Sequence, residues 1–199
     1  MNNPAPTDVP IHDLLTRRWS PRAIDPERAV DAADLRALLE AVRWAPSTFN
    51  EQPWRYLVFD GSKPGSLERA RACLVEGNAW ARKAPVLLLS VARETFSRND
   101  KPNRLAGHDV GLASENLALQ ATALGLALHQ MGGFDAERAR KEFHIPEGFT
   151  PMAMIAVGHP ASADTLPEDL RERELAPRTR RPVEEIAFAG GWDRPFPGS

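Results

Sequence analysis

Two stretches of this sequence combine residue types that can hold an anion. Residues 17–22 contain three arginines and a serine just before a helical region, a composition able to grip a phosphate by charge-assisted hydrogen bonds. A second basic cluster, residues 178–181, lies far away in the chain. Either cluster alone is more often a solvated surface stretch, because arginines ordinarily face water. Only convergence of both clusters on one ligand would indicate an anion site.

Two further stretches could recognise a planar ring. Residues 45–54 join rigid prolines to several amide and hydroxyl groups, which can bind ring heteroatoms or simply form a capped helix-to-strand connection. Residues 130–135 contain Gly132 and Gly133 where a strand should end. A ligand could approach their backbone N–H groups without meeting a Cβ, although an ordinary tight turn explains the pair equally well.

Several other chemistries lack their signatures. The sequence contains neither G-x-S-x-G nor G-x-x-x-x-G-K-[ST], and no G-x-G-x-x-G follows a predicted strand, so hydrolase, P-loop and Rossmann sites are not indicated. The five histidines show no metal-ligand spacing, so we expect no metal site. His108 and Asp109 could face a cleft at the start of a long helix, but a capping aspartate beside an exposed histidine is the favoured interpretation.

Composition limits the partners and the compartment. The formal net charge of -2 gives no overall field that would attract nucleic acid or an anionic membrane. The longest apolar run, residues 84–92, is far shorter than the ~20 residues that span a bilayer. Residues 1–10 form a polar tail without an export signal, and the lone Cys73 excludes an internal disulfide, which fits a reducing cytoplasm.

Hydrophobic patterning predicts helices and strands in irregular alternation. An amphipathic helix is expected over residues 31–44, with Asp31 as its cap, and further helices over 66–75, 110–124 and 135–143. Strands are expected over 54–59, 86–92, 126–130 and 152–157. The nearly continuous apolar run at 86–92 favours a central strand that is buried on both faces. Small residues in the 110–124 helix would allow close packing, in a dimer seam or in the monomer core.

Residues 1–199 are predicted to form a single domain. The last forty residues, 160–199, are rich in Pro, Arg and Glu with little periodicity before Val183, which predicts an extended C-terminal arm.

Taken in order, six motifs resemble those of the nitroreductase family. They are R-x-S, A-P-S-x-x-N-x-Q-P-W, an asparagine before the central strand, G-G-F-D, A-V-G-H-P and R-x-R-x-P. In this sequence they lie at residues 18–20, 45–54, 78, 132–135, 156–160 and 178–182. The A-P-S loop is fairly specific, and the order of all six motifs is strongly so.

The resemblance implies an α+β fold, with a largely antiparallel central sheet wrapped by helices. It also implies a homodimer, formed through the long helix and an exchanged C-terminal arm, with FMN at the subunit interface. Arg18, Ser20 and Arg22 would surround the FMN phosphate and ribityl chain, with Arg178 or Arg180 closing the anion site. The full set of residues that the resemblance assigns to FMN is Arg18, Trp19, Ser20, Arg22, Pro46, Ser47, Asn50, Asn78, Gln130, Met131, Gly132, Gly133, Arg178 and Arg180.

The remaining members of this set are assigned to the flavin ring. Ser47 and Asn50 would reach the ring of the partner subunit, and Asn78 would hydrogen-bond its pyrimidine side. Gly132 would donate its backbone N–H to flavin N5, the atom that carries the hydride, with Met131 and Gly133 lining the ring.

The implied activity is hydride transfer from NADH or NADPH to the flavin, followed by ping-pong reduction of an electron-poor small molecule such as a nitroaromatic or a quinone. Because the nicotinamide cofactor would bind only transiently, no Rossmann motif is required. A flavin-binding or sensing protein without turnover is one alternative. Another is a specialised relative that dehalogenates, dehydrogenates or fragments a flavin. Residues 94–104 lie where relatives vary in the covering of the flavin, so the sequence does not identify the acceptor.

Overall fold

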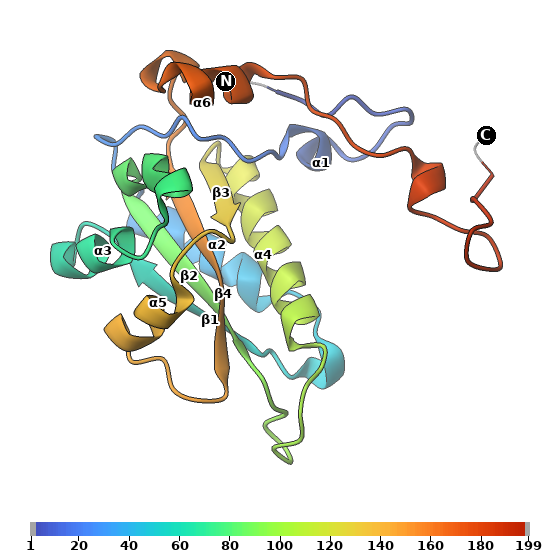
Figure 1. Ribbon diagram of the computed structural model, residues 1–199, viewed down its shortest axis with the longest axis horizontal. Helices are drawn as coiled ribbons and strands as arrows, with labels where there is room; N and C mark the ends of the chain where they lie inside the picture. The colour runs from blue at the N-terminus through green and yellow to red at the C-terminus, as the bar shows by residue number, and fades with distance from the viewer. Residues whose placement is uncertain (1–2, 198–199) are drawn as a thin grey trace.

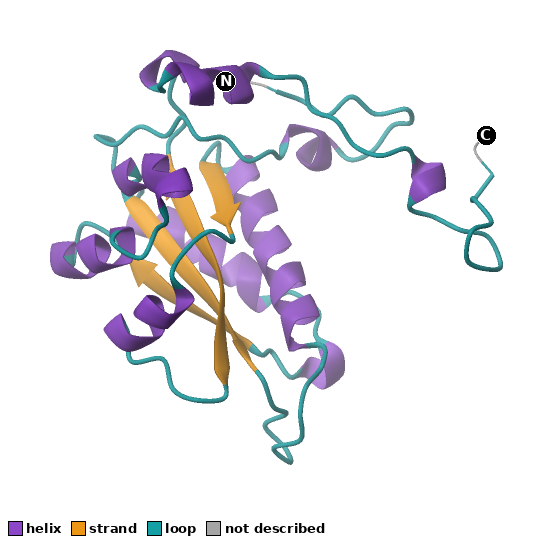
Figure 2. Cartoon of the chain, viewed as in Figure 1, coloured by secondary structure: helices purple, strands orange, loops and turns teal. Residues whose placement is uncertain are grey.

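The computed structural model describes residues 3–197, which fold around one antiparallel sheet. Its four strands lie in the order β1-β2-β4-β3. Their bounds are Trp54–Phe59 for β1, Val86–Arg93 for β2, Ala127–Met131 for β3 and Phe149–Gly158 for β4. Helices cover both faces of the sheet (Figures 1 and 2). The prediction of an α+β fold with an antiparallel central sheet is therefore confirmed.

β2 is the central strand that the sequence predicted. Every residue from Val86 to Ala92 is buried, and β2 pairs with β1 on one side and with β4 on the other. Its residues alternate between two hydrophobic cores, since Leu88 packs into one and Leu87 and Leu89 into the other. Because both faces of the sheet are covered, β2 is apolar at nearly every buried position, and the buried Ser90 donates its hydroxyl to the Ala153 carbonyl.

Two long helices cover one face of the sheet. They are α2 (Ala32–Arg43) and α4 (Ala106–Ala123), and Leu38 and Leu117 meet in the core between them and the sheet. The small residues Ala113, Ala118 and Ala121 of α4 are buried in this same core. Their small size therefore serves packing within the monomer. Asp31 stands at the N-cap of α2, but its side chain makes no capping hydrogen bond.

Some of the shorter helices cover the opposite face of the sheet. Others lie outside the body, by which we mean the sheet and the helices that cover its two faces. Asp135 caps α5 by accepting a hydrogen bond from the backbone N–H of Arg138 at 2.8 Å, as predicted. The other bounds are α1 Asp13–Arg17, η1 Thr48–Asn50, α3 Pro64–Arg71, η2 Glu76–Lys83, α5 Ala136–Glu142, η3 Ala163–Thr165, α6 Glu168–Leu175 and η4 Val183–Glu185. None of the helices within residues 3–197 is both long and apolar enough to cross a membrane.

The C-terminal segment divides into a docked part and a free arm. The expectation of an extended chain from Pro160 onward is wrong for α6, which lies against the N-terminal segment. The sequence did not predict α6 because apolar residues do not recur at helical spacing there. The one buried residue of this helix is Glu174. Beyond Arg178 the chain runs away from the body and ends in a small hairpin, bridged between Phe188 and Pro195 (Figure 1).

Candidate functional site

The two basic clusters approach each other in the folded chain. The Nη1 atom of Arg178 donates to the carbonyl oxygen of Thr16 at 2.8 Å and to that of Asn3 at 3.0 Å. Partial burial, followed by the charges of Arg18 and Arg180, lowers the pKa of the Arg178 guanidinium. Arg178 therefore lies against the segment that carries the first basic cluster, while a common anion site for the two clusters stays a prediction.

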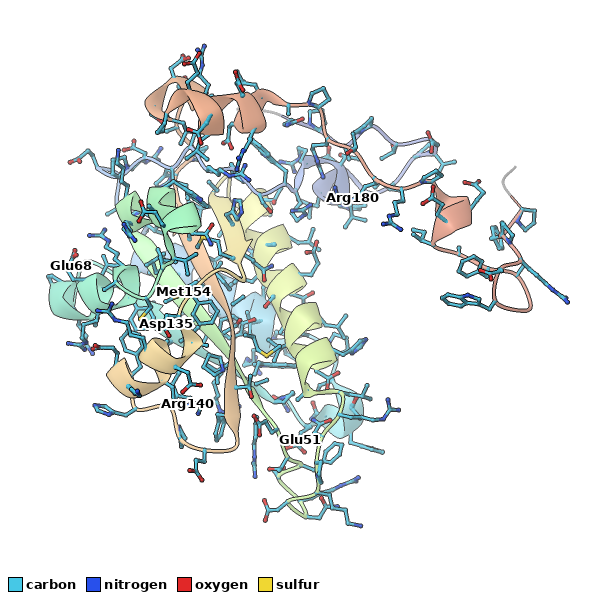
Figure 3. The ribbon with its side chains drawn as sticks, in the orientation of Figure 1. Glu51, Glu68, Asp135, Arg140, Met154 and Arg180 are labelled. Atoms are coloured by element: carbon cyan, nitrogen blue, oxygen red, sulfur yellow. The ribbon has the colours of Figure 1, made fainter. Side chains whose placement is uncertain are left out.

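The arginines around this point differ in their surroundings. Arg18 has one carboxylate nearby, since its Nε lies 3.7 Å from Oε1 of Glu115 in α4. Arg180 is exposed on the outstretched arm, where Figure 3 labels it, and its Nη1 donates to the carbonyl oxygen of Thr179. Of the two C-terminal arginines that the sequence left open, Arg178 is the one that lies against the body.

Arg22 contacts a buried carboxylate. Glu174 is fully buried, and both of its oxygens accept the backbone N–H of Arg22 at 2.9 Å. Its Oε1 also accepts the N–H of Ala23 at 3.0 Å, while the guanidinium of Arg22 lies 3.8 Å away. Glu174 therefore fastens α6 to the N-terminal segment. Since the charge of Arg22 is partly balanced here, its phosphate contact stays a prediction.

His129 fixes the same segment over the end of β3. Its Nδ1 lies 3.1 Å from the carbonyl oxygen of Pro21, and its ring packs against Trp80 at 4.7 Å. Burial lowers the pKa of His129 to about 4, with a further contribution from the charge of Arg22. The imidazole is therefore neutral near pH 7, and Nδ1 must carry the proton because a carbonyl oxygen can only accept. This contact holds Ser20 beside β3, and Trp19 is half-buried in the same segment.

The glycine turn lies next to His129 at the end of β3. Met131 is buried and pairs with Met154, whereas Gly132 is exposed and a Cβ added to it would meet nothing within 4 Å. A Cβ on Gly133 would instead lie 2.7 Å from Nδ2 of Asn78, which donates to the Gly133 carbonyl at 2.9 Å. The turn thus needs glycine at 133 and leaves an open approach at 132. Gln130 reaches back to the carbonyl oxygen of Ser114 at 3.4 Å.

Some of the predicted residues lie on segments that contact one another within a single chain. Arg18, Ser20, Asn78, Arg178 and residues 130–133 are linked through the contacts of Thr16, Pro21 and Gly133. The group combines cations at one end with an open backbone turn at the other, as a phosphate-bearing planar cofactor requires. Within residues 3–197 no three His, Cys, Asp or Glu side chains are grouped so as to hold a metal ion.

The A-P-S loop stands apart from this group. Figure 1 shows η1 at the end of α4 opposite the end near α1. Within the loop, Ser47 Oγ accepts the N–H of Gln52 at 3.0 Å, and the Gln52 amide donates to Oδ1 of Asn50 at 3.0 Å. Pro46 is exposed. The contacts predicted for Pro46, Ser47 and Asn50 with a flavin therefore stay predictions, and they require a second subunit.

Asp109 anchors the A-P-S loop, which corrects the capping role expected from the sequence. Its side chain is 1% exposed, and Oδ2 accepts the backbone N–H of Thr48 at 2.9 Å. Asp109 lies inside α4, whose N-cap is Leu105. His108, whose side chain is 63% exposed, lies 3.2 Å from the other carboxylate oxygen. Sequence reasoning missed Asp109 because its partner lies 61 residues away.

Comparison with known proteins identifies the family of this chain. A family model described as the nitroreductase family matches residues 15–71 and 63–159, so the chain belongs to the nitroreductase family. The resemblance seen in the motifs is thereby confirmed.

Individual relatives span most of the chain. The crystal structure of an oxidoreductase containing FMN has 35% sequence identity, covers 96% of both chains and has a TM-score of 0.89. A putative nitroreductase of Desulfovibrio desulfuricans in complex with FMN is 28% identical over 96% of this chain and 100% of its own, with a TM-score of 0.70. A putative NADH dehydrogenase/NAD(P)H nitroreductase of Streptomyces coelicolor is 27% identical over 184 residues, which is 82% of this chain and 92% of that protein.

Proposed function

We propose that this protein is an FMN-dependent oxidoreductase that takes hydride from NADH or NADPH and passes it to an electron-poor acceptor, such as a nitroaromatic or a quinone. The observation that carries the proposal is the hydrogen bond of Arg178 to the Thr16 carbonyl, in the segment that also carries Arg18, together with the contact between Pro21 and His129 that holds this segment near the open turn at Gly132. FMN carries a phosphate at one end and a redox-active ring at the other, and this group offers a complement to each.

The arginines would bind the phosphate. Both hydrogen bonds of Arg178 use Nη1, so within the described chain Nη2 and Nε remain for an anion. Burial, and then the charges of Arg18 and Arg180, lower the pKa of Arg178, and a bound anion would offset these effects by stabilising the charged guanidinium. Ser20, held beside β3 by the contact between His129 and Pro21, supplies a hydroxyl at the same end.

The glycine turn would hold the ring. When bound, FMN supplies N5 as the atom that accepts and then releases hydride. The Gly132 backbone N–H would donate to N5, and Asn78 keeps the turn in place through the Gly133 carbonyl. No side chain of the turn is required as a general acid or base.

The overall reaction consumes one hydride and one proton per two-electron step. A nitro group and NAD(P)H with H⁺ give a nitroso group, water and NAD(P)⁺, whereas a quinone gives the hydroquinone. Donor and acceptor would use the same ring in turn.

We further propose a homodimer. The A-P-S loop lies at the other end of α4 from the arginine group, so Ser47 and Asn50 could serve only the site of a second copy. The free arm also exposes several large apolar side chains to water, which a second subunit would cover. They are Val183, Ile186, Trp192 and Phe196. A cytoplasmic location fits the single cysteine, Cys73, which is buried and unpaired.

An absorbance spectrum of the purified protein, followed by anaerobic addition of NADH or NADPH, tests the proposal. We expect flavin bands that bleach with at least one donor. Arg178→Gln should weaken FMN binding by at least about tenfold, because a charge-assisted hydrogen bond contributes about 1.5–3 kcal/mol. Arg28→Gln is a matched control on an exposed arginine. A protein that binds no FMN, or an Arg178→Gln variant with unchanged FMN affinity, would contradict the site.

A further inference from the structure

The A-P-S loop holds an aromatic ring out in water. Phe49 is 72% exposed, although the hydrophobic core lies close by. Its φ is +56°, and Asn50 and Gln52 also have positive φ values of +56° and +50°. A left-handed conformation is unfavourable for a bulky side chain, by about 1–3 kcal/mol. The A-P-S loop thus combines an unfavourable backbone conformation with an exposed aromatic ring at Phe49.

A second aromatic ring and an arginine complete a patch around Phe49. The hairpin of residues 94–103, bridged between Thr95 and Pro102, brings Phe96 to 6.1 Å from Phe49 in an edge-to-face arrangement. The Arg98 guanidinium lies 4.3 Å from the centre of the Phe49 ring and 5.4 Å from that of Phe96. We refer to Phe49, Phe96 and Arg98 as the aromatic–arginine patch.

The patch is fastened to the A-P-S loop. Glu51 accepts the backbone N–H of Ser97 at 2.7 Å and lies 3.2 Å from its hydroxyl. Figure 3 labels Glu51 beside this hairpin. These contacts join the hairpin to the loop that carries Ser47 and Asn50.

Arg98 forms no ion pair within 4 Å in the described part of the chain, and the nearby Glu51 carboxylate is bonded to Ser97. Both acids of the hairpin are engaged elsewhere, since Asp100 pairs with Arg93 at 3.3 Å and Glu94 bonds to Thr150. Within residues 3–197 no carboxylate lies within 4 Å of the Arg98 guanidinium, which is held by the two rings instead. Stacking covers the face of a guanidinium and leaves its N–H donors at the edge available.

We propose that the aromatic–arginine patch binds the electron acceptor, and that Arg98 selects planar aromatic acceptors that carry an anionic substituent such as a carboxylate or sulfonate. The acceptor ring stacks against the open part of Phe49, and its anionic group accepts hydrogen bonds from Arg98. This inference rests on the proposed function, because the patch faces a flavin only if Ser47 and Asn50 serve the partner's ring. Arg98 is then a specificity-determining residue and takes no part in hydride transfer.

A pair of nearly isosteric probes tests the preference. Binding of 4-nitrobenzoate and of 4-nitrobenzamide to the oxidised holoprotein is measured by calorimetry without any donor, and kcat/KM is measured for both with NADH or NADPH. The native protein should favour the benzoate by about fivefold, the upper range for an exposed ion pair. Arg98→Gln should abolish the preference, as should high salt, which screens exposed charges.

Two further variants separate charge from stacking. Arg104→Gln removes an exposed arginine next to the same hairpin and should leave the preference intact. Phe49→Leu keeps an apolar side chain without the ring, and should weaken binding of both probes without changing their ratio.

Each contrary result has a defined meaning. If the native protein binds 4-nitrobenzoate and 4-nitrobenzamide equally well, and Arg98→Gln does the same, the inference is overturned. The proposed function is left standing by this result. If Arg98→Gln slows flavin reduction by NADPH but not by NADH, with an unchanged probe ratio, Arg98 recognises the donor's 2′-phosphate and the inference is wrong. Dissociation of a dimer by Arg98→Gln would make the patch a subunit contact and likewise refute it. Preferential benzoate binding without bleaching by either donor would refute the proposed function and uphold the binding preference.

Discussion

Replacing Glu174 by glutamine tests how the C-terminal segment is held on the body. Glu174 is fully buried and receives the backbone N–H groups of Arg22 and Ala23 at 2.9–3.0 Å. Glutamine has almost the same shape, but it replaces one acceptor oxygen with an NH₂ group that would face these donors. It also removes the negative charge that lies 3.8 Å from the Arg22 guanidinium.

The expected loss of stability follows from these contacts. Hydrogen bonds to a charged group contribute about 1.5–3 kcal/mol, and loss of one partner of a buried ion pair costs about 3–5 kcal/mol. Because glutamine keeps one acceptor and the Arg22 side chain is 26% exposed, we expect Glu174→Gln to lower the free energy of unfolding by about 2 kcal/mol. Glu174→Ala, which leaves both N–H groups without an acceptor, should lower it by about 3 kcal/mol.

Urea unfolding of the apoprotein at pH 7 provides the measurement. Glu172→Gln is the matched control, because Glu172 lies exposed on the same helix. Release of α6 should also displace Arg178, so Glu174→Gln should weaken FMN binding, whereas the control should not. A loss below about 0.5 kcal/mol, the range of ordinary surface substitutions, would refute the role assigned to Glu174.

Three other predictions follow from buried groups. Burial lowers the pKa of His129 to about 4, below the unfolded value near 6.5, so the unfolded chain binds the extra proton first and stability falls as pH drops from 6.5 toward 4. Between pH 7 and pH 5 the native protein should lose about 2 kcal/mol more than His129→Gln in urea titrations, and parallel losses would contradict the assignment. Burial raises the pKa of Tyr56, the only tyrosine, to about 12, so phenolate absorbance should be absent from the folded protein at pH 10.5 but present in the denatured protein, whose pKa is about 10. Gly158→Ala would push a Cβ into the Ile24 side chain and should cost about 1–3 kcal/mol in thermal or urea unfolding, whereas Gly65→Ala, with open space around it, should cost nothing.

The sequence determined the sheet and the family. The β1 strand was predicted with the bounds that the structure has, and the apolar run at 86–92 identified the central strand. These signals are local, because a strand buried on both faces needs consecutive apolar residues whatever its neighbours are. The start of α4 was predicted too late because Gly107 and His108, both exposed, interrupt the apolar pattern.

Only the tertiary structure decided which polar residues meet. Glu174 bonds to a segment 152 residues away, and His129 to one 108 residues away. Asp109, taken from the sequence for a helix cap, proved to anchor the A-P-S loop. The sequence could say that an anion site requires the two basic clusters to come together. Only the folded chain shows that Arg178 lies against the segment that carries Arg18. A buried polar contact requires one partner at one position and leaves no periodic pattern, so its partner becomes known only when the chain is folded.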